Sequence, residues 1–187
     1  FYDLMLAGSN RLLRTVEQVL QASRTREKDR SLTISEFEIG KLLRETIDII
    51  QNRYNLEKSA FSYSETDGGA KVSGDYDELQ TVFLNLLDNA VKYSGDEIKI
   101  AVKLKTNRQD KVEIFIRDSG VGIPPEDLKR IFKRFYRVQN SSTQEKKGTG
   151  LGLYIVQAVV KKYGGHIIAK SKGENRGTSF MVQLPKV

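Results

Sequence analysis

The sequence predicts an α+β fold in which helices cover one face of a mostly antiparallel sheet, preceded by one long helix. Two observations lead to this fold class. Segments with apolar residues at helical spacing are mixed with short segments in which apolar and polar residues alternate, and turn-forming residues separate them. The apolar fraction of 39% is also large enough for a buried core. Such elements pack as two layers.

Residues 1–30 are predicted to form the long helix. They contain no proline, and Leu6, Leu13 and Leu20 recur every seven residues. A helix with so wide an apolar stripe needs partner helices. We therefore separate it from a domain at 31–187. The chain begins with Phe1 rather than Met, so we expect a fragment of a longer protein.

The remaining elements follow in order from residue 31. Residues 31–37 indicate a strand, and 38–54 an amphipathic helix. Residues 59–65 and 68–74 are interpreted as a hairpin around the turn TDGG. Further predicted elements are a helix over 75–93 capped by Asp75, strands over 97–105 and 111–118, a helix over about 150–163, and strands over 166–172 and 177–184. The buried face of the 75–93 helix is predicted to be Leu79, Val82, Phe83, Leu86, Leu87 and Ala90.

Composition narrows the functional classes. The chain has no cysteine, which excludes disulfides and cysteine-ligated metals, and no apolar run long enough to span a membrane. Its net charge of +7 favours an anionic partner, which leaves nucleic acid, phospholipid and nucleotide phosphate open. The cations are scattered, so a nucleic-acid binder rests on charge alone.

Three glycines, Gly148, Gly150 and Gly152, directly precede a predicted helix. The first N–H groups of a helix are unpaired, and glycines let an anion approach them closely, which indicates a phosphate site. The spacing fits neither a P-loop nor the dinucleotide fingerprint. A flexible hinge is the alternative.

Asp118 ends an apolar strand and is followed by Gly120 and Gly122. A carboxylate held there can accept a hydrogen bond from an exocyclic amine such as that of adenine, and glycines let a flat ring lie against backbone. A turn capped by the aspartate is the alternative.

Asn85, Asn89 and Lys92 share one stripe beside the apolar face of their helix. Amide oxygens can ligate Mg²⁺ and a lysine can neutralise phosphate, so the stripe suits a Mg²⁺–triphosphate. A solvated helix edge is the alternative. Asp88 is expected to point off this stripe and is a poor candidate for a base.

Residues 131–137 mix aromatic and cationic side chains, and a polar, mostly cationic stretch follows. A loop pinned by aromatics can close over a charged ligand. A surface loop with a hydrophobic anchor explains this segment equally well.

Taken together, these segments resemble the ATP-binding domain of sensor histidine kinases, in the GHKL superfamily. LNLLDNAVKYS is similar to the N box, DSGVGI to the G1 box, IFKRFYR to the F box and GTGLGL to the G2 box. GTSF at 177–180 resembles a last, weaker box, and residues 1–30 resemble the second helix of the dimerisation and phosphoacceptor hairpin.

The resemblance implies a two-layer α/β sandwich of the Bergerat type, with a mixed sheet and helices on one face. It implies Asn89 and Asn85 as Mg²⁺ ligands, Lys92 at the phosphates, Tyr93 near the base and Asp118 on adenine N6. Further implied contacts are Gly120 and Gly122 in the base pocket, Gly148, Gly150, Leu151 and Gly152 at the phosphates by their backbone, Arg134 and Arg137 at the phosphates, and Thr178 on adenine through water.

The resemblance also implies an activity: transfer of the γ-phosphoryl of Mg-ATP to a histidine on the dimerisation hairpin. Gyrase- and Hsp90-type ATPases carry a glutamate base at the position of Asn85, and an asparagine takes no proton, so transfer is favoured over hydrolysis. His166, the one histidine, is interpreted as structural or at the surface. The fragment is therefore expected to bind Mg-ATP without phosphorylating itself.

Partners and location are likewise implied by the family. We expect a response regulator receiver domain, no nucleic acid, and a homodimer through the N-terminal helix of the full-length protein. We expect a cytoplasmic domain of a membrane-anchored bacterial protein. The alternatives are a nucleotide-binding scaffold and another GHKL-type ATPase or serine kinase.

Overall fold

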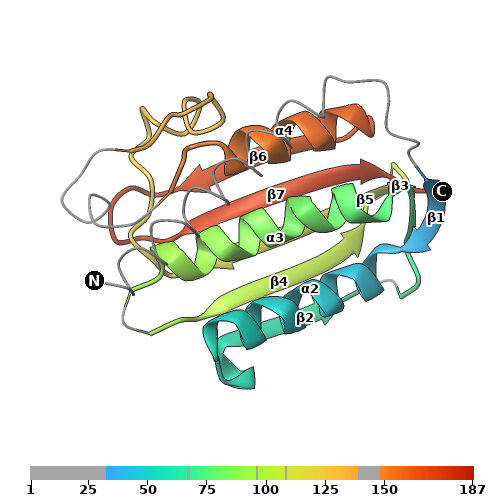
Figure 1. Cartoon of the computed structure of the whole chain (residues 1–187), viewed down its shortest axis with the longest axis horizontal. Helices are drawn as coiled ribbons and strands as arrows, with labels where there is room; N and C mark the ends of the chain where they lie inside the picture. The colour runs from blue at the N-terminus through green and yellow to red at the C-terminus, as the bar shows by residue number, and fades with distance from the viewer. Residues whose placement is uncertain (1–32, 67, 96, 108, 139–147) are drawn as a thin grey trace, which may run out of the picture.

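The computed structural model describes residues 33–187 apart from 67, 96, 108 and 139–147. Within this part of the chain, three α-helices lie over one face of a five-stranded sheet with the order β2-β4-β5-β7-β6 (Figure 1). The expected α+β sandwich is therefore confirmed. The predicted helix over 1–30 lies outside the described residues.

The large sheet is mixed, as the family resemblance implied. Its strands are β2 (Phe61–Glu65), β4 (Ile100–Thr106), β5 (Lys111–Asp118), β6 (His166–Ser171) and β7 (Thr178–Pro185). β2 runs parallel to β4, and the other neighbours are antiparallel. Alternate residues of the central strands, such as Val102, Ile114 and Val182, are buried beneath the helices. The sheet thus presents one apolar face to the helices, as the period of two requires.

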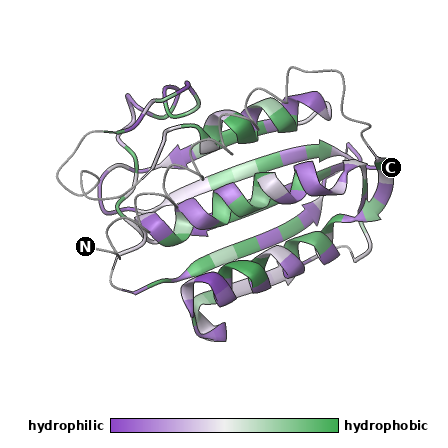
Figure 2. Cartoon of the chain, in the orientation of Figure 1, coloured by the Kyte–Doolittle hydropathy of each residue, from purple (hydrophilic) through white to green (hydrophobic). Residues whose placement is uncertain are grey.

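The helices are α2 (Ile39–Tyr54), α3 (Tyr76–Tyr93) and α4 (Gly152–Lys162), and a short 3₁₀ helix spans Lys58–Ala60. In α3, Asp75 Oδ1 accepts a hydrogen bond from the Glu78 N–H at 3.1 Å, which confirms the predicted N-cap. The whole predicted inner face of α3 is buried. Figure 2 shows the resulting alternation of apolar and polar stripes along the helices.

The predicted hairpin of 59–65 with 68–74 is wrong. β2 pairs with β4, whereas β3 (Lys71–Asp75) pairs with β1 (Ile34–Glu38) in a separate two-stranded sheet. A turn is present between them, and Gly69 has φ +80°. The strands on either side of this turn find distant partners, since Tyr63 lies beside Val102 and Val72 beside Phe37. The residues of a turn therefore do not determine which strands its neighbours pair with.

The remaining strand and helix predictions after residue 75 are confirmed to within a few residues. The C-terminal end of β5, the start of β7 and the N-terminal end of α4 lie beside the second half of α3 at one end of the molecule (Figure 1). Among the described residues, every helix is too short or too polar to cross a lipid bilayer.

Candidate nucleotide-binding site

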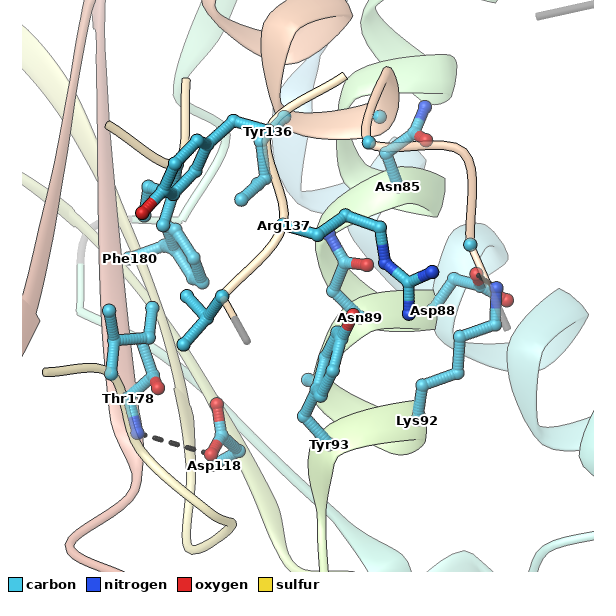
Figure 3. A pocket seen from close by; sticks show the side chains of 18 of the residues that line it. Asn85, Asp88, Asn89, Lys92, Tyr93, Asp118, Tyr136, Arg137, Thr178 and Phe180 are labelled. Atoms are coloured by element: carbon cyan, nitrogen blue, oxygen red, sulfur yellow. Dashed lines mark hydrogen bonds and ion pairs between the residues drawn. The ribbon is translucent and has the colours of Figure 1, made fainter. Parts of the chain in front are cut away.

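A cavity open to solvent lies between α3 and the strands β5 and β7. Figure 3 shows Asp118, Thr178 and Phe180 on the strand side and Asn85, Asn89 and Tyr93 on the α3 side. Arg137 extends toward α3 from the loop that also carries Tyr136. Two walls that are far apart in sequence therefore face each other.

Most of the predicted site residues line this cavity. They are Asn85, Asn89, Lys92, Tyr93, Asp118, Gly122, Arg137, Gly148, Gly150, Gly152 and Thr178. The four segments singled out by sequence therefore converge at one place, although they lie far apart along the chain. This convergence makes a common ligand a better explanation than separate turns, hinges and helix edges.

Three predicted residues are not on the cavity wall. Gly120 packs against Tyr93, where an added Cβ would lie 2.0 Å from the Tyr93 carbonyl oxygen. Leu151 is 2% exposed and belongs to the core. The Arg134 guanidinium lies 4.4 Å from the ring centroid of Tyr154 and bonds to its hydroxyl, so it contacts α4 instead.

Asp118 is a buried carboxylate at the end of β5, with 6% of its surface exposed. Its Oδ1 accepts hydrogen bonds from the N–H groups of Gly120 at 2.9 Å and Thr178 at 3.1 Å. Burial raises the pKa of this carboxyl group, and the backbone donors partly oppose that rise. Figure 3 shows the other oxygen toward the cavity. The side chain is therefore a fixed acceptor for a ligand donor.

The amide stripe of α3 forms the opposite wall. Asn85 Nδ2 donates to the Thr81 carbonyl at 2.9 Å, and its Oδ1 faces the start of α4, where a Cβ on Gly152 would lie 2.8 Å away. Among the described residues, the half-buried Asn89 amide has no hydrogen-bond partner, although it lines the cavity. Buried amides are normally paired, so Asn89 is placed to contact a ligand.

The expectation that Asp88 points away from the stripe is wrong. Asp88 lines the cavity, and its Oδ2 forms an ion pair with Lys92 Nζ at 2.5 Å. The reason is helical geometry, since a residue three positions after Asn85 is only about 60° around the axis. Its Oδ1 also accepts a hydrogen bond from Tyr54 at 2.6 Å. A carboxylate bonded in this way is not placed to act as a base.

The N-terminal end of α4 supplies the third wall. Leu151 is its N-cap residue, and the Leu151 side chain makes no capping hydrogen bond to the first N–H groups, which suits an anion at this helix end. Gly150 has φ +73°, and its carbonyl accepts from the Phe135 N–H at 3.0 Å. A Cβ at this position would lie 2.7 Å from the Phe135 carbonyl carbon. Here glycine is required both by conformation and by space.

Sequence reasoning did not assign several lining residues. They are Ala90, Ile123, Ile131, Tyr136, Val138, Thr149, Leu153 and Phe180. The period of two in β7 could have found Phe180, because it shares a face with Thr178. Tyr136 donates a hydrogen bond to the buried Asp127, nine residues earlier in the chain. This separation matches neither helix nor strand periodicity, so the sequence pattern could not predict the contact.

The fold and this cavity define a nucleotide-binding α+β domain. Residues 74–187 match the protein family described as "Histidine kinase-, DNA gyrase B-, and HSP90-like ATPase". The chain belongs to that family, as an ATP-binding catalytic domain of the sensor histidine kinase type.

Individual relatives support this assignment. The chain is 33% identical over 186 residues to the sensor protein SrrB of Staphylococcus aureus (strain NCTC 8325 / PS 47), covering 98% of this chain and 31% of SrrB. It therefore spans about a third of the length of that relative. Its structure is similar to the mycobacterial sensor histidine kinase MprB, with a TM-score of 0.69, 29% identity and coverage of 81% of this chain and 97% of the solved one. The catalytic domain of histidine kinase ThkA gives a TM-score of 0.69 at 26% identity, covering 83% of this chain and 99% of the ThkA chain.

Proposed function

We propose that this domain binds Mg-ATP in the cavity and presents the γ-phosphate to a histidine outside the described residues. The phosphoryl group would then pass to the receiver domain of a response regulator. The observation that carries this proposal is the pair of walls: a fixed carboxylate, Asp118, on one side, and the unpartnered amide of Asn89 on the other. Such walls suit a ligand with an amine at one end and a metal-bound anion at the other.

The adenine ring would lie on the Asp118 side of the cavity. Asp118 accepts from the exocyclic amine of adenine, Tyr93 lies near the ring, and Thr178 contacts the base through water. Gly122 lines the cavity with φ +71°, and an added Cβ would lie 2.1 Å from the Gly173 carbonyl oxygen, so glycine is needed for these two backbone segments to pack here. The carboxylate prefers adenine over guanine, which carries an oxygen at this position.

The phosphates would lie between α3 and α4. Lys92 and Arg137 neutralise their charge, and the backbone at Gly148, Gly150 and Gly152 approaches them closely. Among the described residues, no cluster of three or more His, Cys, Asp or Glu side chains could hold a metal by itself. This fits Mg²⁺, which is commonly held by few protein oxygens together with substrate phosphates. Asn89 and Asn85 would hold it, and the ion would neutralise phosphate charge and orient the γ-phosphate.

The transfer step needs a nucleophile from outside the cavity. A ring nitrogen of the acceptor histidine forms a bond to the γ-phosphorus, the bond to the leaving oxygen of ADP breaks, and the ring proton passes to solvent. Asn85 takes no proton, and Asp88 is held by Lys92 and Tyr54. Because neither of these two α3 side chains can activate water, transfer to a side chain is favoured over hydrolysis.

The rest of the parent protein belongs to the same proposal. Residues 1–30 would form part of a dimerisation hairpin, and 31–187 the catalytic domain, in a membrane-anchored bacterial sensor that dimerises through that helix. His166 is exposed at the first residue of β6 and does not line the cavity, so it is not placed to accept phosphate. The isolated chain should therefore bind Mg-ATP and remain unlabelled.

Two measurements on the chain test this proposal. Calorimetry with a non-hydrolysable ATP analogue should show binding that is strengthened by Mg²⁺. Incubation with ATP labelled on its γ-phosphate should leave the protein unlabelled and release little inorganic phosphate. Label on His166 would contradict the assignment of the acceptor, and rapid phosphate release would favour a GHKL ATPase instead.

A further inference from the structure

The Asp88 carboxylate, which lies on the cavity wall, contacts three polar side chains. Its Oδ2 lies 2.5 Å from Lys92 Nζ, and its Oδ1 lies 2.6 Å from the Tyr54 hydroxyl and 3.6 Å from Arg53 Nη1. The Asp88 side chain is 20% exposed and that of Lys92 35%. These contacts are partly shielded from water, so the charges act on each other more strongly than a surface pair does.

This cluster joins a helix outside the cavity to a charge inside it. Lys92 and Asp88 line the cavity, whereas Arg53 and Tyr54 belong to the last turn of α2 and do not. Figure 3 shows Asp88 and Lys92 on the same side of the cavity, at the end toward which Arg137 reaches. The contacts run from α2 through Asp88 to the ammonium group that would meet phosphate.

The pairing limits what Lys92 can offer an anion. In the free domain its charge is largely balanced by Asp88, and an incoming phosphate must share the ammonium with that carboxylate or displace it. The carboxylate itself also repels the phosphates. Arg53 and Tyr54 of α2 have the opposite effect on phosphate binding. They also bond to the Asp88 carboxylate, and this weakens its hold on Lys92.

We propose that Asp88 is a positioning residue that holds Lys92 as a counter-ion and thereby lowers the affinity of the cavity for phosphate groups. This inference rests on the proposed function, because it takes the Lys92 end of the cavity to be the phosphate end. We further infer that α2, through Arg53 and Tyr54, adjusts the affinity of the cavity for phosphate groups. Asp88 acts through Lys92 and leaves the base end unaffected.

The substitution Asp88→Asn tests the proposal. Asparagine keeps the shape and can still accept from Tyr54, but it removes the charge. We expect the non-hydrolysable ATP analogue and ADP to bind about five- to tenfold more tightly in calorimetry, and adenosine to change by less than about twofold. Unchanged or weaker binding of the ATP analogue overturns the proposal, as does a parallel change for adenosine, which would indicate a purely structural effect.

A double-substitution cycle identifies the route of the effect. In the Lys92→Met background, Asp88→Asn should give less than about a twofold gain, because the ammonium that it would release is missing. A gain of the same size in both backgrounds overturns the proposal in favour of direct repulsion between Asp88 and phosphate. Arg53→Gln should have the opposite sign and weaken the ATP analogue about twofold; a gain in affinity would contradict the role given to α2.

A matched control lies on the same helix. Glu78 pairs with Lys162 at 2.8 Å and does not line the cavity, so Glu78→Gln should leave the affinity for the ATP analogue unchanged. Thermal unfolding of each variant verifies that it is folded. If the unsubstituted domain binds neither the ATP analogue nor adenosine, the proposed function fails and this inference fails with it. If it binds both and Asp88→Asn brings no gain, only this inference fails.

Discussion

The two ends of α3 both carry polar side chains, but these side chains differ in whether they have hydrogen-bond partners. At the N-terminal end, both carboxylate oxygens of Glu78 lie 2.8 Å from Lys162 Nζ, and the Tyr163 hydroxyl donates to Glu78 at 2.6 Å. That hydroxyl also accepts from the Asp75 N–H at 3.2 Å. Toward the C-terminal end, the Asn89 amide has no partner among the described residues. One helix thus has a closed end and an open end.

The length of α4 explains this difference. α4 runs antiparallel to α3, so its last residues meet Glu78 and its first residues meet Asn85. Beyond Asn85, α4 no longer covers α3, and the polar side chains of Asn89 and Lys92 line the cavity. The site therefore lies beyond the N-terminal end of α4, where α3 is no longer covered. Substitutions at the closed end should change stability, and those at the open end should change ligand binding.

The largest effect on binding is expected on the strand side of the open end. Asp118→Asn keeps the shape and can retain the bonds from Gly120 and Thr178 on its oxygen, which turns the amide N–H₂ toward the ligand. Two donors then face each other at adenine N6, so ATP-analogue affinity should fall at least about 100-fold, while the preference for adenine over guanine nucleotides also falls. Competition calorimetry with the two nucleotides measures both. Unchanged selectivity would contradict the role of Asp118.

A pair of glycines tests the start of α4. Gly150→Ala places a Cβ 2.7 Å from the Phe135 backbone at a positive φ, whereas a Cβ on Gly148 meets nothing within 4 Å. We expect Gly150→Ala to weaken the ATP analogue about tenfold and to destabilise the fold by about 1–3 kcal/mol. Gly148→Ala should change affinity by less than about threefold. Equal effects in calorimetry and urea unfolding would indicate that the α4 start is not held by this contact.

The closed end should respond in stability alone. Burial and the hydrogen bond to Glu78 raise the pKa of Tyr163, so its hydroxyl remains a donor at neutral pH. Tyr163→Phe removes that donor and the acceptor for the Asp75 N–H, which should cost about 1–2 kcal/mol in the free energy of unfolding. Nucleotide affinity should stay within about twofold. A large loss of affinity with little change in stability would reverse the distinction between the two ends.

The smallest predicted effect is a pH dependence. Because burial raises the pKa of Asp118, protonation begins at a higher pH than for an ordinary aspartate. Adenosine, which carries no phosphate, should lose several-fold in affinity as the pH falls through the raised pKa of Asp118, and Asp118→Asn should lack this dependence. The effect on folding has the opposite sign, since a raised acid pKa favours the folded state below the unfolded pKa and that contribution is lost as pH rises through the folded pKa.

Local rules in the sequence predicted most of the elements and much of the site. The cap at Asp75 and the apolar spacing of α3 are properties of neighbouring residues, and both are confirmed. The pairing of β2 with β4 depends on residues about 40 positions apart, and a turn motif suggested a hairpin in its place. Long-range pairing is decided by which surfaces can be buried together, which no single segment contains.

The same limit explains the misplaced site residues. The family resemblance implied Arg134 as a phosphate contact, but its guanidinium stacks on Tyr154, a contact that follows from the tertiary fold. Asp88 was excluded for its direction, yet the angle between positions three apart was available from the sequence. The hydrogen bond that Asp88 accepts from Tyr54 could not be predicted from the sequence, because Tyr54 belongs to another helix.

The amide wall of α3 is tested most directly by the Mg²⁺ dependence of ATP-analogue binding in the unsubstituted domain and in Asn89→Ala, with adenosine as the ligand that lacks phosphate. We expect Mg²⁺ to tighten binding of the analogue at least about tenfold in the unsubstituted domain, this gain to disappear in Asn89→Ala, and adenosine to bind equally to both. An Asn89→Ala domain that keeps the full Mg²⁺ gain would contradict the assignment of this amide wall to a metal-bound triphosphate.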